Sequence, residues 1–406
     1  MDFEIRLDYF ALNTTGSEEL AAEVKTFYDK ALIDLAEPEC VFASLGQKKN
    51  IPEHSGRYVE FRRFEPLSDA LAALEEGVTP NGQQLEATAV EARLEQYGGF
   101  VEVSDLLDMT AVDNTVVEAT KLLAEQAART LDTVVRDELL TGTGVLYASG
   151  SGSAPDSRVG LTADSYLTVK DVVRAATMLR AKNAPTFDGS YIAVVHPYVA
   201  AQLLAEPVAG WVDVIKYADP KKIIKGELGT VAGVRFVENA RAKVTEAGTI
   251  GGVKTLTVAA DTAAGDDTLL LSGAADAASL EGADIVVGGE IYKVLECSET
   301  GGVLEATVDG ELPAISEGAT VTAPDSSADG SSVFTTEVLA KGAFGVTGLG
   351  AGAIEHIVKQ RGSGYDPLDQ RATVGWKATQ AVKLLVDDYA VRIESCSPMA
   401  KSAPSN

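Results

Sequence analysis

Apolar side chains recur at helical spacing along one long segment of the chain, residues 114–140. Thr115 and Glu118 have the spacing of a capping box, in which two side chains satisfy backbone N–H groups at a helix start. A stripe of apolar residues follows on one face: Val116, Leu123, Ala127, Leu131, Val134 and Val135. At about 1.5 Å per residue, the pattern predicts a helix of roughly 40 Å that packs against a core.

Two segments before this helix alternate apolar and polar positions as β-strands do. The first is RYVEFRRF, residues 57–64, and the second is TAVEARLEQYGGFVEV, residues 88–103. About twenty residues with little apolar content join them, which is longer than most loops inside compact domains. We therefore predict a long β-hairpin that projects from the chain to contact another molecule.

The segment after the long helix mixes helical and strand patterns. A Gly/Ser-rich loop precedes a predicted helix at residues 168–182, and the apolar strand YIAVVHP precedes another helix at 198–206. Further along, Tyr389, Val391 and Ile393 alternate with Arg392 and Glu394 as in a strand. These elements predict an α+β fold.

Residues 245–333 interrupt this pattern with short strand-like runs that are rich in Val, Thr, Ala and Gly. The dipeptide Gly288–Gly289 separates two of the runs and is typical of a two-residue hairpin turn. Strand-like segments flank the region on both sides, VRFVEN before it and VFTTEVLA after it. Because domain insertion is tolerated at exposed connections, we predict a small all-β domain inserted between two strands of another domain.

The same region is strongly acidic. It holds 16 Asp and Glu against two Lys, in a chain whose formal net charge is −26. Phosphate binding needs a basic face, so this charge argues against a protein that grips nucleic acid. The aspartates Asp266, Asp267, Asp325 and Asp329 could hold a cation, but no DxDxDG loop surrounds them, and a solvated acidic face is the alternative interpretation.

The totals place the chain among soluble globular proteins. Its 406 residues are enough for two or three domains. Cys40, Cys297 and Cys396 are too scattered for a disulfide framework or a zinc site, so we expect reduced thiols. The start, MDFEIRLDYF, does not have the regions of a signal peptide, and no run approaches a membrane span in length. We expect a soluble protein made in the cytoplasm.

No catalytic signature stands out. His54, His196 and His356 are not at metal-ligand spacing from one another or from a cysteine, and we expect them to be structural or surface residues. GLGAGA, residues 348–353, fits the GxGxxA pattern of dinucleotide sites, but the segment after it is too short and polar for the required crossover helix. We predict no enzyme activity, cofactor or metal site, and keep a dinucleotide-binding enzyme as an alternative.

Several segments together resemble a known family. They cover almost the whole chain outside the first residues and the 245–333 region: VKTFYDKALIDLAEPE, RYVEFRRFEPL, LEEGVTPNGQ, DMTAVDNTVVEATKLLAEQAARTLDTVVRDELL, VHPYVAAQLL, KGELGTVAGVRFVE and EHIVKQRGSGYDPLDQRATVGWKAT. In this order they resemble the major capsid proteins of tailed bacteriophages, specifically the N-four-type family. The resemblance implies the Hong Kong 97-type capsid fold.

On this resemblance the chain divides into the parts of that fold. The expected parts are an N-terminal arm (1–56), an extended β-hairpin loop (57–103), a peripheral domain (104–166 and 351–406) with the 114–140 segment as its spine helix, an axial domain (167–244 and 334–350), and the inserted acidic all-β domain (245–333).

The function that the resemblance implies is structural: copies of the chain form the hexamers and pentamers of an icosahedral shell around double-stranded DNA. We expect a virion capsid that assembles in the cytoplasm of the host bacterium. A separate scaffolding protein, a portal and decoration proteins are expected partners, the packaged DNA is contacted weakly and non-specifically, and no membrane is involved. An encapsulin-like compartment shell, which shares the fold, is the alternative.

Four residues are candidates for contacts between subunits. Arg62 and Arg63 lie in the first strand of the predicted loop. Arg371 and Trp376 lie in DPLDQRATVGWKAT, residues 366–379, the strongest motif of the resemblance. Arginine and tryptophan are the residue types that most often anchor buried contacts between chains. We assign this motif to subunit packing or to the strand that supports it, and the alternative is a purely internal role.

Overall fold

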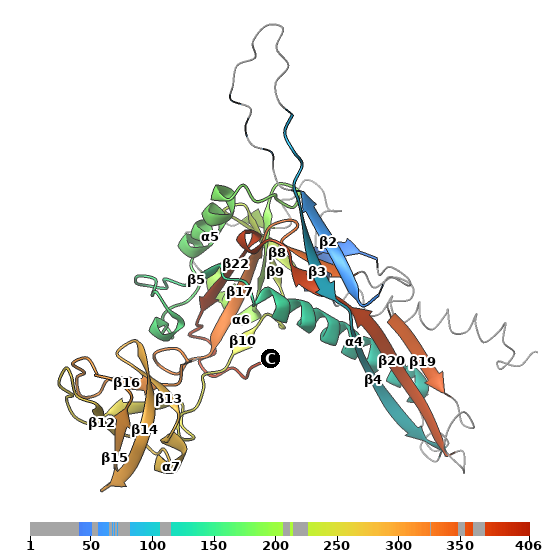
Figure 1. Cartoon of the computed structure of the whole chain (residues 1–406). Coiled ribbons are helices and arrows are strands. Elements are labelled where there is room, and N and C mark those ends of the chain that lie inside the picture. The colour runs from blue at the N-terminus through green and yellow to red at the C-terminus, as the bar shows by residue number, and fades with distance from the viewer. Residues whose placement is uncertain are drawn as a thin grey trace, which may run out of the picture. The chain divides into compact units, whose positions relative to one another are not determined.

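The computed structural model describes residues 40–50, 56–64, 67, 69, 71, 82–105, 115–205, 212–213, 226–324, 326–347, 354–359 and 370–406. These residues fall into two compact units, and Figure 1 labels many of their elements. The first unit holds described residues up to Val135 together with Gly345–Lys383, and the second holds Arg136–Phe344 and Leu384–Asn406. The predicted N-terminal arm and GLGAGA lie largely or wholly outside the described residues.

The first unit contains the predicted hairpin. Strands β2 (Tyr58–Phe64) and β3 (Ala87–Arg93) pair antiparallel, with Tyr58 opposite Arg93 and Phe64 opposite Ala87. The hairpin is shorter than the sequence pattern predicts, because the second strand ends at Arg93. The pattern predicts a hairpin that continues through residue 103. Instead, strand β4 (Glu95–Ser104) pairs with β20 (Arg371–Gln380) over ten residue pairs.

The first strand of this hairpin packs closely against a glycine of another strand. Phe61 and Val59 of β2 are buried. A Cβ atom at Gly345 would lie 2.5 Å from the Phe61 ring, so only glycine allows the ring to approach this backbone. Gly345 belongs to β18 (Phe344–Thr347), which forms a three-stranded sheet in the order β1 (Gln47–Lys49), β18, β21 (Val382–Leu384). A short helix, α2 (Phe42–Leu45), precedes β1.

The long helix forms where the periodicity predicts it. Helix α4 covers Thr115–Leu139 and begins and ends within one residue of the predicted limits. In the first unit its apolar stripe packs on one face of a second three-stranded sheet, in the order β19 (Ile354–Lys359), β20, β4. The residues of this core are Leu123, Ala124, Ala127, Leu131, Ile354, Val374, Trp376 and Ala378.

The second unit is built on a mixed sheet. Its main path runs in the order β5 (Val145–Tyr147), β22 (Ala390–Ser395), β17 (Val333–Leu339), β6 (Tyr191–Val195), β9 (Val234–Glu238), β8 (Glu227–Val231), β7 (Val212–Asp213). Strands β6 and β9 are parallel, whereas β17 is antiparallel to both of its neighbours on this path. Helices α5 (Val169–Ala181) and α6 (Pro197–Ala205) contribute to the core with this sheet. Thr168 caps α5 with Asp171 in a capping box.

The strand pairing also crosses the expected boundary between the peripheral and axial domains. The peripheral domain is expected to include residues 104–166 and 351–406, but β5 and β22 lie in the same sheet as β6 and β9 of the expected axial segment. Strand β22 pairs along its length with β17, from Ser395 opposite Phe334 to Ala390 opposite Leu339. The alternating pattern predicts β22 correctly as a strand but does not specify its partner, because pairing depends on residues distant in the sequence.

Residues 255–322 contain a closed antiparallel β-barrel. Its strands are β11 (Thr255–Val258), β12 (Thr268–Ser272), β15 (Val303–Val308), β14 (Glu290–Thr300), β13 (Asp284–Val287) and β16 (Thr320–Thr322), in that spatial order, with the short helix α7 (Ala277–Leu280). The predicted Gly288–Gly289 turn joins β13 to β14, and both glycines have positive φ, 62° and 90°. The barrel encloses its own apolar core.

The chain enters and leaves the barrel region through two paired strands. In β10 (Val244–Thr245), Val244 lies opposite Phe334 and Thr245 opposite Val333. After β16 the chain passes through a buried serine-rich turn, in which the Asp329 carboxylate accepts hydrogen bonds from the N–H groups of Ala163 (2.8 Å) and Ser331 (3.1 Å). Asp329 therefore holds the returning chain against the 158–165 segment.

Residues 401–406 lie across both connections to the barrel. The N–H of Ser332 donates to the carbonyl of Lys401 at 2.8 Å, and the Lys254 ammonium donates to the hydroxyl of Ser402 at 2.6 Å. The Asn406 side chain makes hydrogen bonds with four groups: Arg136 Nη1 (3.0 Å), the N–H of Val244 (3.0 Å), and the carbonyls of Ala242 (3.0 Å) and Ala240 (3.4 Å). We call residues 401–406 the strap.

Candidate subunit interface

The exposed face of the hairpin carries the first candidate residue. Arg62 is exposed and makes two 3.1 Å hydrogen bonds to the carboxylate of Glu60 on the same strand. The Arg62 guanidinium holds the pKa of the Glu60 carboxyl below its usual range. Arg63 points to the opposite side of the strand, where it lies opposite Thr88. Arg62 is the more exposed of the two arginines, since Arg63 is half-buried.

Trp376 has an internal role. Only 3 % of the residue is exposed, and the indole N–H donates to Oε1 of Gln126 on α4 at 3.1 Å. Gly99 of β4 makes room for this bond, because a Cβ atom there would lie 2.5 Å from Gln126 Oε1 and 3.3 Å from Trp376 Nε1. The burial of Trp376 within its own chain corrects its prediction as a subunit contact. The residue supports the strand instead.

Arg371 lies on the opposite face of the same strand. Its side chain is exposed, and its Nη1 atom lies 3.5 Å from Oε2 of Glu102. We call this side of the β19, β20, β4 sheet, which faces away from α4, the outer face. Alternation along the strands places Phe100 and Ile357 on it, and the register aligns both with Gly375. Residues 366–369 of the predicted motif lie outside the described residues.

Two of the histidines considered as candidates are buried or half-buried within the chain, and one candidate aspartate accepts hydrogen bonds from it. His196 is half-buried, with its ring centroid 5.0 Å from that of Phe334, and burial lowers the pKa of its imidazole. His356 is buried on β19, opposite Trp376. Burial opposes ionisation of Asp329, but the hydrogen bonds from Ala163 and Ser331, together with that from Ser327, hold the pKa of its carboxyl below its usual range. His54 and Asp325 lie outside the described residues.

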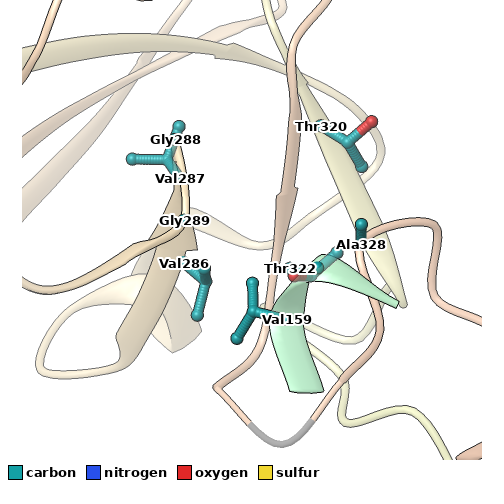
Figure 2. Close-up of a pocket in the computed structure, with 9 residues that line it drawn as sticks. Val159, Val286, Val287, Gly288, Gly289, Thr320, Thr322 and Ala328 are labelled. Atoms are coloured by element: carbon teal, nitrogen blue, oxygen red, sulfur yellow. The ribbon is translucent and has the colours of Figure 1, made fainter. Parts of the chain in front are cut away.

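A cavity of about 330 Å³ lies beside the barrel. Its lining carries valine side chains and threonine hydroxyls but no titratable group: Val159, Gly160, Val286, Val287, Gly288, Gly289, Thr320, Thr322 and Ala328. Figure 2 shows the side chains of Val286, Val159 and Thr322 gathered at one side of it.

Metal-binding clusters and membrane-spanning helices are both absent from the described part of the chain. It contains no cluster of three or more His, Cys, Asp or Glu residues with the geometry to hold a metal ion. Within the same residues, no helix combines the length and the apolar character that crossing a membrane requires.

Comparison with known proteins identifies the type of fold. Residues 87–221 match the model of a family described as phage capsid protein. The chain is similar to the capsid of Ralstonia phage GP4, with 14 % identity over 89 % of each chain and a TM-score of 0.56. It also matches the capsid of cyanophage P-SCSP1u, with 13 % identity over 88 % of each chain and a TM-score of 0.49. No curated protein matches the chain.

The likeness to the GP4 capsid shows that the chain has the mixed α and β fold of a phage capsid protein. The family match includes α4 and α6, which lie in segments that carry the sequence resemblance, together with β3, β4 and α5. Together these findings confirm the prediction of a phage major capsid protein.

Sequence reasoning missed three residues of the outer face and its support. Nothing in the sequence singles out Phe100 and Ile357, because an apolar residue in a strand is usually part of a core. Gln126 is not recognisable as the partner of Trp376, since nothing local marks it. The pair Gly98–Gly99 inside a strand pattern is the one available signal, because glycine there often marks close approach of another group.

Proposed function

We propose that this chain is a structural coat protein that assembles, as hexamers and pentamers, into an icosahedral shell around double-stranded DNA. The observation that carries the proposal is the family match over residues 87–221, which includes the whole predicted spine helix, within a chain that shares the capsid fold. The arrangement is of the Hong Kong 97 type, with the hairpin as extended loop and α4 as spine. An encapsulin-like shell has less support, because the matching family is one of phage capsids.

The partners follow from the shell. We infer assembly in the bacterial cytoplasm with a separate scaffolding protein, closure with a portal, and optional decoration proteins. The net charge of −26 favours weak, non-specific contact with the packaged DNA. Arg62 and Arg371 are the two exposed arginines that we propose at contacts between copies, and Arg63 is retained as a hairpin residue near such a contact.

The barrel is proposed as an autonomous, outward-facing domain. Its region carries 16 acidic residues against two lysines, and these charges would repel packed phosphate on the DNA side. On the outside, salt screens them over about 8 Å at physiological ionic strength. The apolar core that the barrel encloses favours independent folding.

Purification and electron microscopy test the proposed function directly. The chain should form rings, hexamers, pentamers or shells, alone or after co-expression with its scaffolding protein, and sedimentation should show the same species. A monomer at every concentration, with scaffolding protein present, would falsify the proposal. Particles that contain an enzyme cargo and no DNA in the infected host would favour the compartment instead.

A further inference from the structure

The outer face of the β19, β20, β4 sheet has an apolar centre where a polar one is expected. Antiparallel sheets with one face on a core present polar side chains on the other. Here Phe100 is 70 % exposed and Ile357 is 38 % exposed. Gly375 lies between them in the register, opposite Phe100 on one side and Ile357 on the other, so the three form a row across the sheet.

Gly375 keeps this row flat. A Cβ atom at position 375 would lie 2.9 Å from Phe100 Cβ, so a larger residue would push the phenylalanine away from the sheet. Without a side chain at position 375, nothing on the central strand stands between the exposed side chains of Phe100 and Ile357. The row is therefore an exposed apolar strip on the surface of the single chain.

The charges around the row differ from those of the chain as a whole. Alternation and register place three cations and two acids on this face: Arg371, Lys377, Lys359, Glu102 and Glu355. The face thus has a small positive excess in a chain of net charge −26. Complementary charge raises the rate and the specificity of association, so the fitting partner has a predominantly acidic surface.

We propose that the outer face, centred on Phe100, Gly375 and Ile357, is a contact surface for a second copy of this chain. A second copy supplies the acidic surface that the three cations favour. The inference rests on the proposed function and specifies one of the surfaces by which copies associate.

The size of the face sets the strength expected of one such contact. Three strands about 4.8 Å apart and six residues long, at about 3.3 Å each, give on the order of 300 Å². A standard specific interface needs roughly 800 Å² per partner, so this contact alone is too small for a stable dimer. A closed shell repeats it in every subunit and combines it with others, and this repetition allows a weak contact to contribute.

The test compares the double variant Phe100→Ser, Ile357→Thr with the control Ile291→Thr. Ile291 is a 60 % exposed isoleucine on the barrel, which belongs to the second unit and contributes no residue to the outer face. The double variant should need about tenfold more protein for assembly, measured by sedimentation and particle counting, because it loses apolar contact area at the interface. Its melting temperature should stay near that of the wild type, and the control should assemble normally.

A charge variant provides a second arm that is independent of apolar packing. Arg371→Glu with Lys377→Glu should also raise the protein concentration needed for assembly, and added salt should restore part of the loss by screening the new repulsion.

Wild-type assembly by both double variants would overturn this inference and leave the proposed function intact. A wild-type chain that never assembles would overturn the proposed function itself. Normal self-assembly of the variants with loss of binding to a different virion protein would overturn the choice of partner and assign the face to that protein.

Discussion

Trp376 and Arg371 lie five positions apart on one strand and have opposite surroundings. Trp376 is buried against α4, whereas the Arg371 side chain is exposed on the outer face. Trp376→Ala should therefore lower the free energy of unfolding by about 3–5 kcal/mol, through lost burial and the cavity it leaves. Urea denaturation of the soluble chain measures this loss.

Arg371→Ala is the matched control for that experiment. An exposed substitution should change the free energy of unfolding by no more than about 0.5 kcal/mol, while particle yield falls if the residue contacts another copy. Equal destabilisation by both variants would contradict the assignment of internal and external roles.

Glu337 provides a pH-dependent contribution to stability. Burial in the main sheet raises the pKa of its carboxyl from the ordinary 4.5 to about 7; Arg392 on the neighbouring strand opposes the shift and Glu394 adds to it. Glu394 is itself bound by Arg158 through hydrogen bonds of 2.7 and 2.6 Å. In the folded chain, Glu337 therefore keeps its proton well above the ordinary pKa of a glutamate.

The sign of the effect follows from proton binding. Between pH 4.5 and 7 the folded chain keeps a proton that the unfolded chain releases, so stability falls as pH rises through this window. The group should account for a loss of about 3 kcal/mol across it. Glu337→Gln should remove that part of the slope in denaturation curves at pH 4.5 to 8. Exposed Glu305→Gln controls for the charge change, and an unchanged slope in Glu337→Gln would contradict the assignment.

At the scale of elements, the strap connects three parts of the second unit. Asn406 bonds to the α4 residue Arg136 and to β10 at Val244, while Ser402 bonds to Lys254 near the start of β11. Short polar contacts of this kind brace the two strands through which the chain enters and leaves the barrel. Periodicity does not indicate this role, since the 401–406 segment has neither a helical nor a strand pattern.

Asn406→Ala tests the strap. The variant leaves the N–H of Val244 and the Arg136 guanidinium without the oxygen that they share, which should cost about 1 kcal/mol. Hydrogen exchange at the Val244 amide should quicken. Ser405→Ala is the control, because residue 405 is exposed. Equal exchange rates in wild type and Asn406→Ala would show that the strap does not protect this junction.

At the scale of the whole molecule, the barrel can be excised at two different points. Gly248 and Ala323 approach each other, since a Cβ atom at Gly248 would lie 2.7 Å from that of Ala323. Joining Thr249 to Ala323 removes residues 250–322 and keeps the Asp329 contacts. Joining Thr245 to Val333 through Asn-Gly uses the paired strands of the junction but removes Asp329 and the buried serines.

The two excisions should differ in stability. The shorter deletion should leave a folded, cooperative core, and the longer one should unfold at lower denaturant concentration, because Leu161, Ala163 and the strap lose their partners in the serine-rich turn. Circular dichroism and urea titration measure both. Residues 250–323 expressed alone should give a β-type spectrum and a separate melting transition. Loss of folding in the shorter deletion would contradict an independent core.

The features that short-range physics encodes could be predicted from the chain alone. Helix α4, the strands of the barrel and the Gly288–Gly289 turn follow from side-chain periodicity and from backbone conformations that few residues adopt. The ordered resemblance across the chain predicted the capsid protein that the family match confirms. The tertiary structure alone decides which strands pair and which face of a strand is buried. The break at Leu94, the place of β22 beside β17 and the burial of Trp376 depend on hydrogen-bond partners and packing surfaces that lie far away in the sequence, so no local pattern could specify them.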